Sequence, residues 1–137
     1  MNSIELRREL HRHPELSFEE HATQRLIMEA LQSEGITCRK IAQTGVLATI
    51  EGKRGNLKRA VVLRADIDAL PIEELNDIEY RSTNKGIMHA CGHDMHTAIL
   101  FGVLQELNRE RDFEGTLFGI FQPGEELNPG GASLVLK

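Results

Sequence analysis

The sequence is poor in aromatic side chains: its 137 residues include one tyrosine and no tryptophan, and aromatic residues make up 4% of the chain. Proteins that bind single-stranded nucleic acid stack the bases on aromatic side chains. The formal net charge of −5 also opposes contact with phosphate backbones, which depends on lysine and arginine. We therefore expect no nucleic-acid partner.

Long apolar runs and paired cysteines are also missing. No apolar run approaches the roughly 20 residues that span a bilayer, and the charges spread through residues 1–10 do not form a signal peptide. The two cysteines, Cys38 and Cys91, are far apart and do not suggest a disulfide framework. We expect no membrane partner and a cytoplasmic location.

Local patterns predict helices near the N-terminus. Asn2 with Glu5 and Ser17 with Glu20 have the spacing of capping boxes, which mark helix starts. The first helix should end before Pro14, because the residue before a proline avoids helical torsions. The second should end near a glycine at position 35.

The rest of the chain alternates strands and helices. Strands are expected over 36–41, 46–51, 60–63 and 116–121, and a helix over about 94–111; residues 52–56 should form an exposed turn. The apolar run 60–63 suits a strand buried on both faces of a covered sheet. This order predicts a layered α/β domain. Residues 130–137 resemble the opening of a further helix, so we expect an N-terminal piece of a longer protein.

Three clusters of metal-ligating or acidic residues stand out. The segment 88–96 contains three histidines, a cysteine and an aspartate, a density that chance rarely produces. The other two clusters are Asp66 with Asp68 and Glu125 with Glu126. Ligands of open α/β sheets bind outside the carboxyl ends of the strands. The clusters are therefore predicted to converge on one cleft.

Cys91 and His93 are the strongest ligand candidates. In an extended loop, side chains at i and i+2 point the same way, so both could reach one metal or a close pair of metals. The following helix start should favour the thiolate. His89 is expected to bond only its loop, and His96 to orient a ligand or to be a plain polar position. The run 11–15 is expected to be a helix end without a catalytic role.

The acidic pairs have more than one interpretation. Adjacent side chains such as Glu125 and Glu126 should diverge, so one can ligate a metal while the other acts as general base. They could instead be solvated carboxylates in the first turn of a helix. Asp66 and Asp68 could ligate, orient a ligand, or pair with Arg64 in a salt-bridged loop.

Rival chemistries fit the sequence less well. A zinc deaminase needs a His-x-Glu motif followed by Pro-Cys-x-x-Cys, and both are absent. A structural zinc site has four cysteine or histidine ligands, which one usable cysteine does not favour. A cysteine hydrolase with Cys91 as nucleophile and a histidine base stays open, although it leaves the glutamate pair without a role.

Four ordered motifs carry a family resemblance. Residues 6–17, 63–72, 88–96 and 121–126, the last followed by Gly-Gly-Ala at 130–132, resemble those of the di-metal amidohydrolases of the aminoacylase/carboxypeptidase metallopeptidase superfamily. The nearest subgroup contains N-acyl-L-amino-acid amidohydrolases, hippurate hydrolase and the plant auxin-conjugate hydrolases.

The resemblance implies a three-layer α/β catalytic domain with a central mixed, mainly parallel sheet and an inserted smaller domain used for dimerisation. Residues 1–137 would be the N-terminal portion of that catalytic domain, without the inserted domain and the C-terminal part. The parent protein would be a homodimer or a larger assembly.

The resemblance also implies two divalent ions, Zn²⁺ or Mn²⁺, with Co²⁺ or Ni²⁺ as alternatives. Cys91, His93 and Glu126 match metal ligands, and Glu125 matches the general base. Asp66 stands where related peptidases have a histidine ligand, which leaves it without an assigned role.

The expected function is metal-dependent hydrolysis of the amide bond of N-acyl amino acids or small peptide-like amides by the parent protein. Two further histidine ligands of the family lie beyond this chain. The alternative is therefore a non-catalytic fragment that binds metal weakly or only packs with a partner. Gly124 stands where the subgroup commonly has alanine, and we expect it to add backbone freedom without altering the chemistry.

Overall fold

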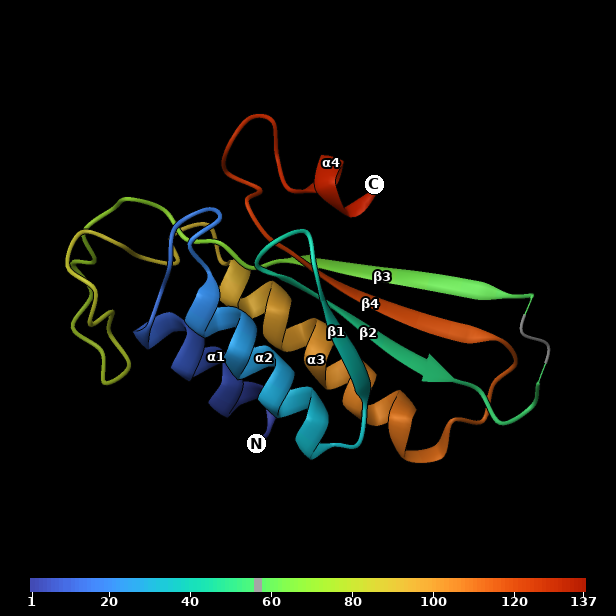
Figure 1. Cartoon of the computed structure of the whole chain (residues 1–137). Helices are drawn as coiled ribbons and strands as arrows, with labels where there is room; N and C mark the ends of the chain where they lie inside the picture. The colour runs from blue at the N-terminus through green and yellow to red at the C-terminus, as the bar shows by residue number, and fades with distance from the viewer. Residues whose placement is uncertain (56–57) are drawn as a thin grey trace.

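The computed structural model describes residues 1–55 and 58–137. Its elements, labelled in Figure 1, are α1 (Ser3–Arg12), α2 (His21–Ser33), β1 (Thr37–Ile41), β2 (Gly45–Glu51), β3 (Ala60–Asp66), α3 (His93–Glu110), β4 (Thr116–Gln122) and α4 (Ala132–Val135). The predicted alternation is confirmed, and Asn2 and Glu5 form the predicted capping box of α1. Asn56, placed by the sequence in an exposed turn, lies outside the described residues. No helix in the described ranges is long and apolar enough to cross a membrane.

The four strands form one mixed sheet in the order β1-β2-β4-β3. β3 and β4 are parallel, whereas β1 with β2 and β2 with β4 are antiparallel. The expected mixed sheet is confirmed, but parallel pairs are not the majority among the described strands. A short turn joins β1 to β2 and forces an antiparallel pair, whereas α3 provides the long crossover that a parallel pair needs.

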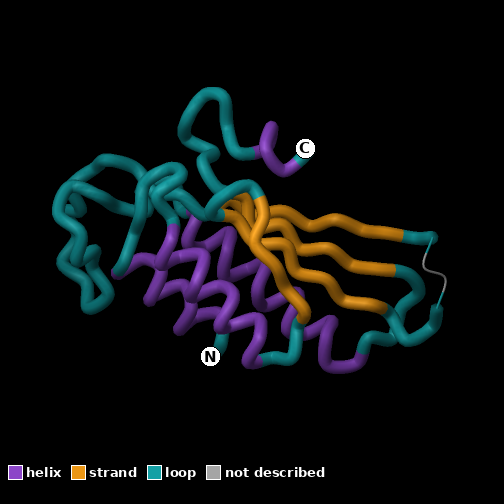
Figure 2. The backbone as a smooth tube through the Cα atoms, viewed as in Figure 1, coloured by secondary structure: helices purple, strands orange, loops and turns teal. Residues whose placement is uncertain are grey.

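The helices α1, α2 and α3 lie together on one face of the sheet (Figures 1 and 2), and α4 lies apart from them. The described residues thus form two of the three expected layers. The core lies between this face and the helices. Gly119 on β4 allows close packing there, because a Cβ at this position would lie 2.6 Å from Leu104 Cδ1 on α3. Fully buried members of the core include Leu6, Ile27, Leu31, Val46, Phe101 and Phe121.

Strand β3 departs from the prediction of a strand buried on both faces. Val61 and Val62 are 59% and 55% exposed. Both side chains are exposed because β3 is an edge strand and the helices cover only one face of the sheet. Its register with β4 continues to the pair Asp66 and Gln122. The carboxyl ends of both strands therefore lie side by side.

The start of α2 is built differently from the predicted capping box. The side chain of Glu20 caps nothing at the helix start, and the hydroxyl of Ser17 donates to a distant aspartate. Instead, the carboxylate of Glu15 accepts from the backbone N–H groups of Ala22 and Thr23, at 3.0 and 2.6 Å. The side chains of Ser17 and Glu20 are therefore available to bond Asp68 and the Gly124 backbone.

Candidate metal centre

Three segments meet where β3 and β4 end. Asp66 is the last residue of β3 and Asp68 follows it, while Glu125 and Glu126 follow β4. His93 is the first residue of α3, the helix that connects the two strands. Asp68 contacts both His93 and Glu126. The predicted convergence of the three clusters is therefore observed.

Cys91, His93 and Glu126 form a compact group. The sulfur, one ring nitrogen and one carboxylate oxygen lie within 4.8 Å of one another. The backbone that joins Cys91 to His93 is not extended as predicted, because Gly92 between them is left-handed with φ +91°. Thiolate, imidazole and carboxylate together form a donor set typical of divalent transition metals.

His93 presents one nitrogen to this group. Its Nδ1–H donates to the carbonyl oxygen of Asp68 at 2.9 Å, and the Asp68 carboxylate lies 3.2 Å from the same nitrogen. Because both neighbours are acceptors, Nδ1 carries a proton and Nε2 is the atom left for a metal ion. Burial would lower the pKa of His93, but the hydrogen bond with Asp68 and the charges of Asp66 and Asp68 outweigh burial and raise that pKa. Nε2 faces Glu126 Oε1 at 3.7 Å. A histidine held in this way is oriented to bind a metal ion, so the residues fit such an ion.

Asp68 organises both sides of the group. The residue is 1% exposed, and its carboxylate accepts from the Ser17 hydroxyl at 2.7 Å and from the Glu126 backbone N–H at 2.9 Å. Burial alone would raise the pKa of Asp68, but the hydrogen bonds from His93, Glu126 and Ser17 outweigh it and hold that pKa well below its usual range. Asp68 therefore stays ionised and fixes His93 and Glu126 together.

Glu125 and Glu126 approach the same atom. Glu125 Oε2 lies 3.8 Å from His93 Nε2, and Glu126 Oε1 lies 3.7 Å from it. The predicted divergence of the two side chains is therefore wrong. They differ in access to solvent, with 41% of the Glu125 side chain exposed against 24% for Glu126. The Glu126 amide is also tied to Asp68. Glu125 is thus the more open carboxylate beside the group.

The loop before the glutamate pair is held by Glu20. This carboxylate is fully buried, accepts from the Gly124 backbone N–H at 2.8 Å, and accepts from the Thr44 hydroxyl. Gly124 has φ +58°, and a Cβ there would lie 2.4 Å from the ring of Phe18. Gly124 is therefore confined by its neighbours, contrary to the expectation that it mainly adds freedom. Sequence patterns placed Glu20 in a capping box and missed this role, because its partner Gly124 is 104 positions away.

The thiol of Cys91 does not behave as predicted. The start of a helix was expected to favour the thiolate, but the pKa of Cys91 is raised. Partial loss of solvent around the sulfur comes first, followed by the hydrogen bond with Glu126 and the charges of Glu126 and Glu125. Loss of solvent and the neighbouring carboxylates thus both disfavour the thiolate. The carboxylates also form an anionic site that favours a bound cation.

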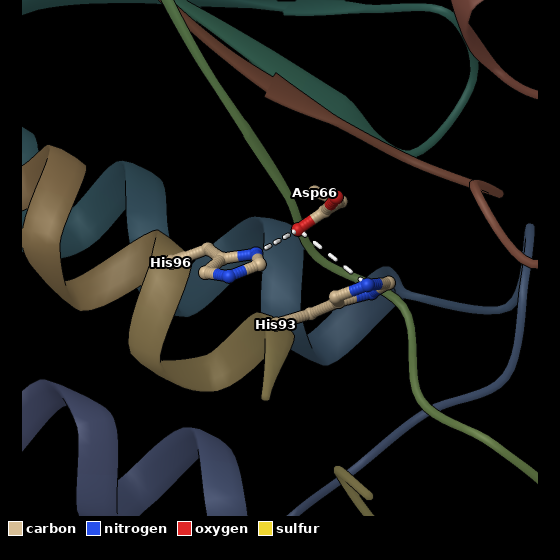
Figure 3. Close-up of side chains that lie close together, drawn as sticks. All are labelled: Asp66, His93 and His96. Carbon is tan, nitrogen blue, oxygen red and sulfur yellow. Dashed lines mark hydrogen bonds and ion pairs between the residues drawn. The ribbon is translucent and has the colours of Figure 1, made fainter. Parts of the chain in front are cut away.

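Asp66 and His96 extend the group on one side. Figure 3 shows the Asp66 carboxylate between the rings of His93 and His96. Asp66 Oδ1 lies 2.7 Å from His96 Nδ1 and 3.6 Å from His93 Nε2. The ligand atoms of these three residues also lie within 4.8 Å of one another. Arg64 lies 3.5 Å from the other Asp66 oxygen, as one interpretation of the sequence expected. His96 therefore binds Asp66 and orients it.

His89 is buried without a partner. The sequence suggested a hydrogen bond with its loop, but neither ring nitrogen has a partner among the described residues, and the side chain is 4% exposed. Burial is the main cause that lowers the pKa of His89 to about 4; nearby Asp94 opposes the shift and the charge of His11 adds to it. His89 is therefore neutral near pH 7.

This shift predicts a loss of stability in acid. In the unfolded chain His89 binds a proton below its ordinary pKa of 6.5, whereas in the folded chain it does so only below about pH 4. The free energy of unfolding should fall by about 3 kcal/mol across this interval. Urea denaturation at a series of pH values in EDTA buffer measures it. The variant His89→Leu should lose this component and be no less stable at pH 7, and an unchanged slope would contradict the prediction.

Comparison with known proteins places this geometry in a family. The model of the peptidase family M20/M25/M40 matches residues 62–137, more than half of the chain. An N-acyl-L-amino acid amidohydrolase of Geobacillus stearothermophilus is 47% identical over 136 residues, which are 98% of this chain and 36% of that protein. An N-acetyl-L-cysteine deacetylase of Bacillus subtilis is 47% identical over 134 residues, with 96% and 32% covered.

A solved structure has the same architecture. It is a dinuclear metal binding peptidase from Bacillus subtilis, 44% identical, with a TM-score of 0.92 over 98% of this chain and 38% of that one. The chain thus spans about a third of the length of the relatives that it matches. The match of the family model, the close relatives and the shared architecture agree, and the chain belongs to the peptidase family M20/M25/M40.

Proposed function

We propose that residues 1–137 are the N-terminal portion of the catalytic domain of a metal-dependent amidohydrolase. Its reaction is hydrolysis of the amide bond of N-acyl amino acids or small peptide-like amides. The observation that carries this proposal is the group of Cys91, His93 and Glu126, with Glu125 beside the same histidine nitrogen. The names of the two relatives, an N-acyl-amino-acid amidohydrolase and a deacetylase, support the substrate class.

Two divalent ions are proposed as cofactors. The support is the donor set together with the solved relative, which is described as a dinuclear metal binding peptidase. Cys91, His93 and Glu126 would hold metal, and such donors suit Zn²⁺ or Mn²⁺, with Co²⁺ or Ni²⁺ as alternatives. When bound, divalent ions supply Lewis acidity for the amide carbonyl and lower the pKa of water.

The chain's own residues then move the proton. Glu125, the more exposed of the two carboxylates, accepts a proton from the attacking water and returns it to the leaving amine. Asp68 keeps Nδ1 of His93 protonated and holds the Glu126 amide, so the ligand side chains keep their orientation. In this proposal Glu125 is the general base and Asp68 orients the ligands. The ligands are Cys91, His93 and Glu126.

Two other interpretations can be tested against this one. In the first, Cys91 is a nucleophile, which its raised pKa disfavours because the thiolate is the reactive form. In the second, the 137-residue chain is a non-catalytic fragment, which the coverage of about a third of its relatives permits. A homodimeric parent and a cytoplasmic location stay predictions.

Removal of metal tests the proposal. Hydrolysis of N-acetyl amino acids should fall to background after dialysis against EDTA and return when Zn²⁺ or Mn²⁺ is added. Elemental analysis of the active protein should give two ions per chain. The measurement is best made on the 137-residue chain beside any longer product of the same reading frame, because turnover by the longer protein alone identifies the shorter one as an inactive portion.

The same assay separates the alternatives. Activity that survives EDTA and disappears on alkylation of Cys91 would replace the metal proposal with the nucleophile. Two tightly bound ions and turnover in the 137-residue chain would reject the fragment interpretation.

A further inference from the structure

A second polar cluster lies buried beside the candidate metal centre. It joins His11 of α1, Glu74 of the segment between β3 and α3, and Asp94 of the first turn of α3, with exposures of 3%, 2% and 1%. His11 Nδ1 lies 2.8 Å from Asp94 Oδ2, and His11 Nε2 lies 2.9 Å from Glu74 Oε1. We call these three residues the buried triad. The proposed reaction uses none of them.

The bonds of the triad suit a charged histidine beside two ionised carboxylates. Both ring nitrogens of His11 face carboxylate oxygens, and only the imidazolium can donate from both. Arg7 adds a second cation, with Nε 2.9 Å from Asp94 Oδ2. Two cations thus balance the carboxylates of Glu74 and Asp94. Buried charges are tolerated when they are paired and hydrogen-bonded in this way.

The triad fixes the two segments that carry the proposed ligands. Asp94 directly follows His93 in the first turn of α3, so its bond to His11 ties the start of α3 to α1, which packs beside it (Figure 1). Glu74 belongs to the segment that leads to Cys91. Its carboxylate accepts from the backbone N–H of Ser82 at 2.6 Å, which closes that segment on itself.

The contacts of the triad complement those of Asp68. Asp68 holds the ring of His93 and the amide of Glu126 from the side of the sheet, whereas the triad holds the backbone next to His93 from the side of α1. Loss of the His11 bonds would leave the two buried carboxylates without their shared donor. The chain around Cys91 and His93 would then have to move to solvate them.

We propose that His11, bonded to Glu74 and Asp94, is a positioning residue that sets where Cys91 and His93 stand for metal binding. This inference rests on the proposed function. His11 touches neither metal nor substrate and acts through the backbone of its partners. Residues that orient metal ligands typically change metal affinity by about 10- to 100-fold when they are replaced.

The test is a titration of the purified protein with Co²⁺, which gives a thiolate-to-cobalt absorption band when Cys91 binds. In His11→Gln, Co²⁺ affinity should fall by about 10- to 100-fold and the band should weaken, while the circular dichroism spectrum keeps its native shape. Glu74→Gln removes the carboxylate charge at the bond between His11 and Glu74. It should also lower the Co²⁺ affinity and weaken the band. Leu31→Ala on α2 removes a fully buried side chain outside the triad, so it should lower the melting temperature without changing the Co²⁺ affinity.

The outcomes separate this inference from the proposed function. A wild-type protein without the cobalt–thiolate band overturns the ligand assignment and the positioning role with it. A normal wild-type band together with unchanged affinity in both triad variants overturns the positioning role alone. Failure of both variants to fold also overturns it, because the triad would then support the fold rather than the site.

Discussion

Replacing Glu125 with glutamine should lower kcat for hydrolysis of an N-acyl amino acid by about 10²- to 10⁴-fold, the usual contribution of a general base. Glutamine keeps the size of the side chain but cannot accept the proton. The metal content should stay at the wild-type level, because the compact group of ligand atoms contains Glu126 and not Glu125. Steady-state kinetics and elemental analysis of the same samples measure both quantities.

Glu126→Gln is the matched control, since it makes the same chemical change at the adjacent position. It should reduce the metal content and leave part of the lost activity recoverable with excess metal. The reverse result, in which Glu126→Gln keeps its metal and loses kcat while Glu125→Gln loses metal, would exchange the two roles. Full activity in Glu125→Gln would contradict the proposed mechanism.

Replacing Asp68 with asparagine should destabilise the protein by about 3 kcal/mol, as expected when one partner of a buried charged network is removed. In either orientation the amide nitrogen of asparagine would face a donor: the Ser17 hydroxyl and the Glu126 N–H in one, or His93 Nδ1–H in the other. Metal affinity should also fall by about 10- to 100-fold, because His93 loses the partner that orients it. Urea denaturation and metal titration measure the two effects.

Ser17→Ala provides the scale for this prediction, because it removes one donor and leaves the Asp68 charge in place. Its cost should be about 1 kcal/mol, the size of one hydrogen bond. The pH dependence of the free energy of unfolding provides a further check. Because the folded pKa of Asp68 is depressed, its stabilising contribution is present above the ordinary carboxyl range and is lost as the pH falls below it. Asp68→Asn should lack this acid-dependent component, and equal stability of wild type and Asp68→Asn would contradict the role given to the carboxylate.

The features predicted correctly from sequence are mostly local. The capping box of α1 joins residues three positions apart, and the strand and helix positions follow from periodicity and glycine placement. The meeting of the acidic and histidine clusters follows from a general rule for the ends of parallel strands. Each of these inferences needs only neighbouring residues or a topological rule.

The failures involve partners far along the chain. Ser17 bonds Asp68 from 51 positions away, and His11 bonds Glu74 and Asp94 from 63 and 83 positions away. No short window contains both partners of such a bond. The exposure of Val62 depends on which strand is last in the sheet, and the pKa of Cys91 depends on carboxylates that arrive with another strand. These properties depend on how the strands, helices and loops of the chain pack together, which a local sequence pattern does not contain.

The parallel register of β3 and β4 has a consequence for how the chain can vary between related proteins. Asp66 pairs with Gln122, four positions before Glu126, and a slip of one residue would turn every side chain of a strand to the opposite face. A single-residue insertion or deletion within β4 would therefore replace the carboxylate that reaches the centre. The turn between α3 and β4 is at the far end of these strands, so changes of length between homologues should be tolerated there and excluded inside the strands.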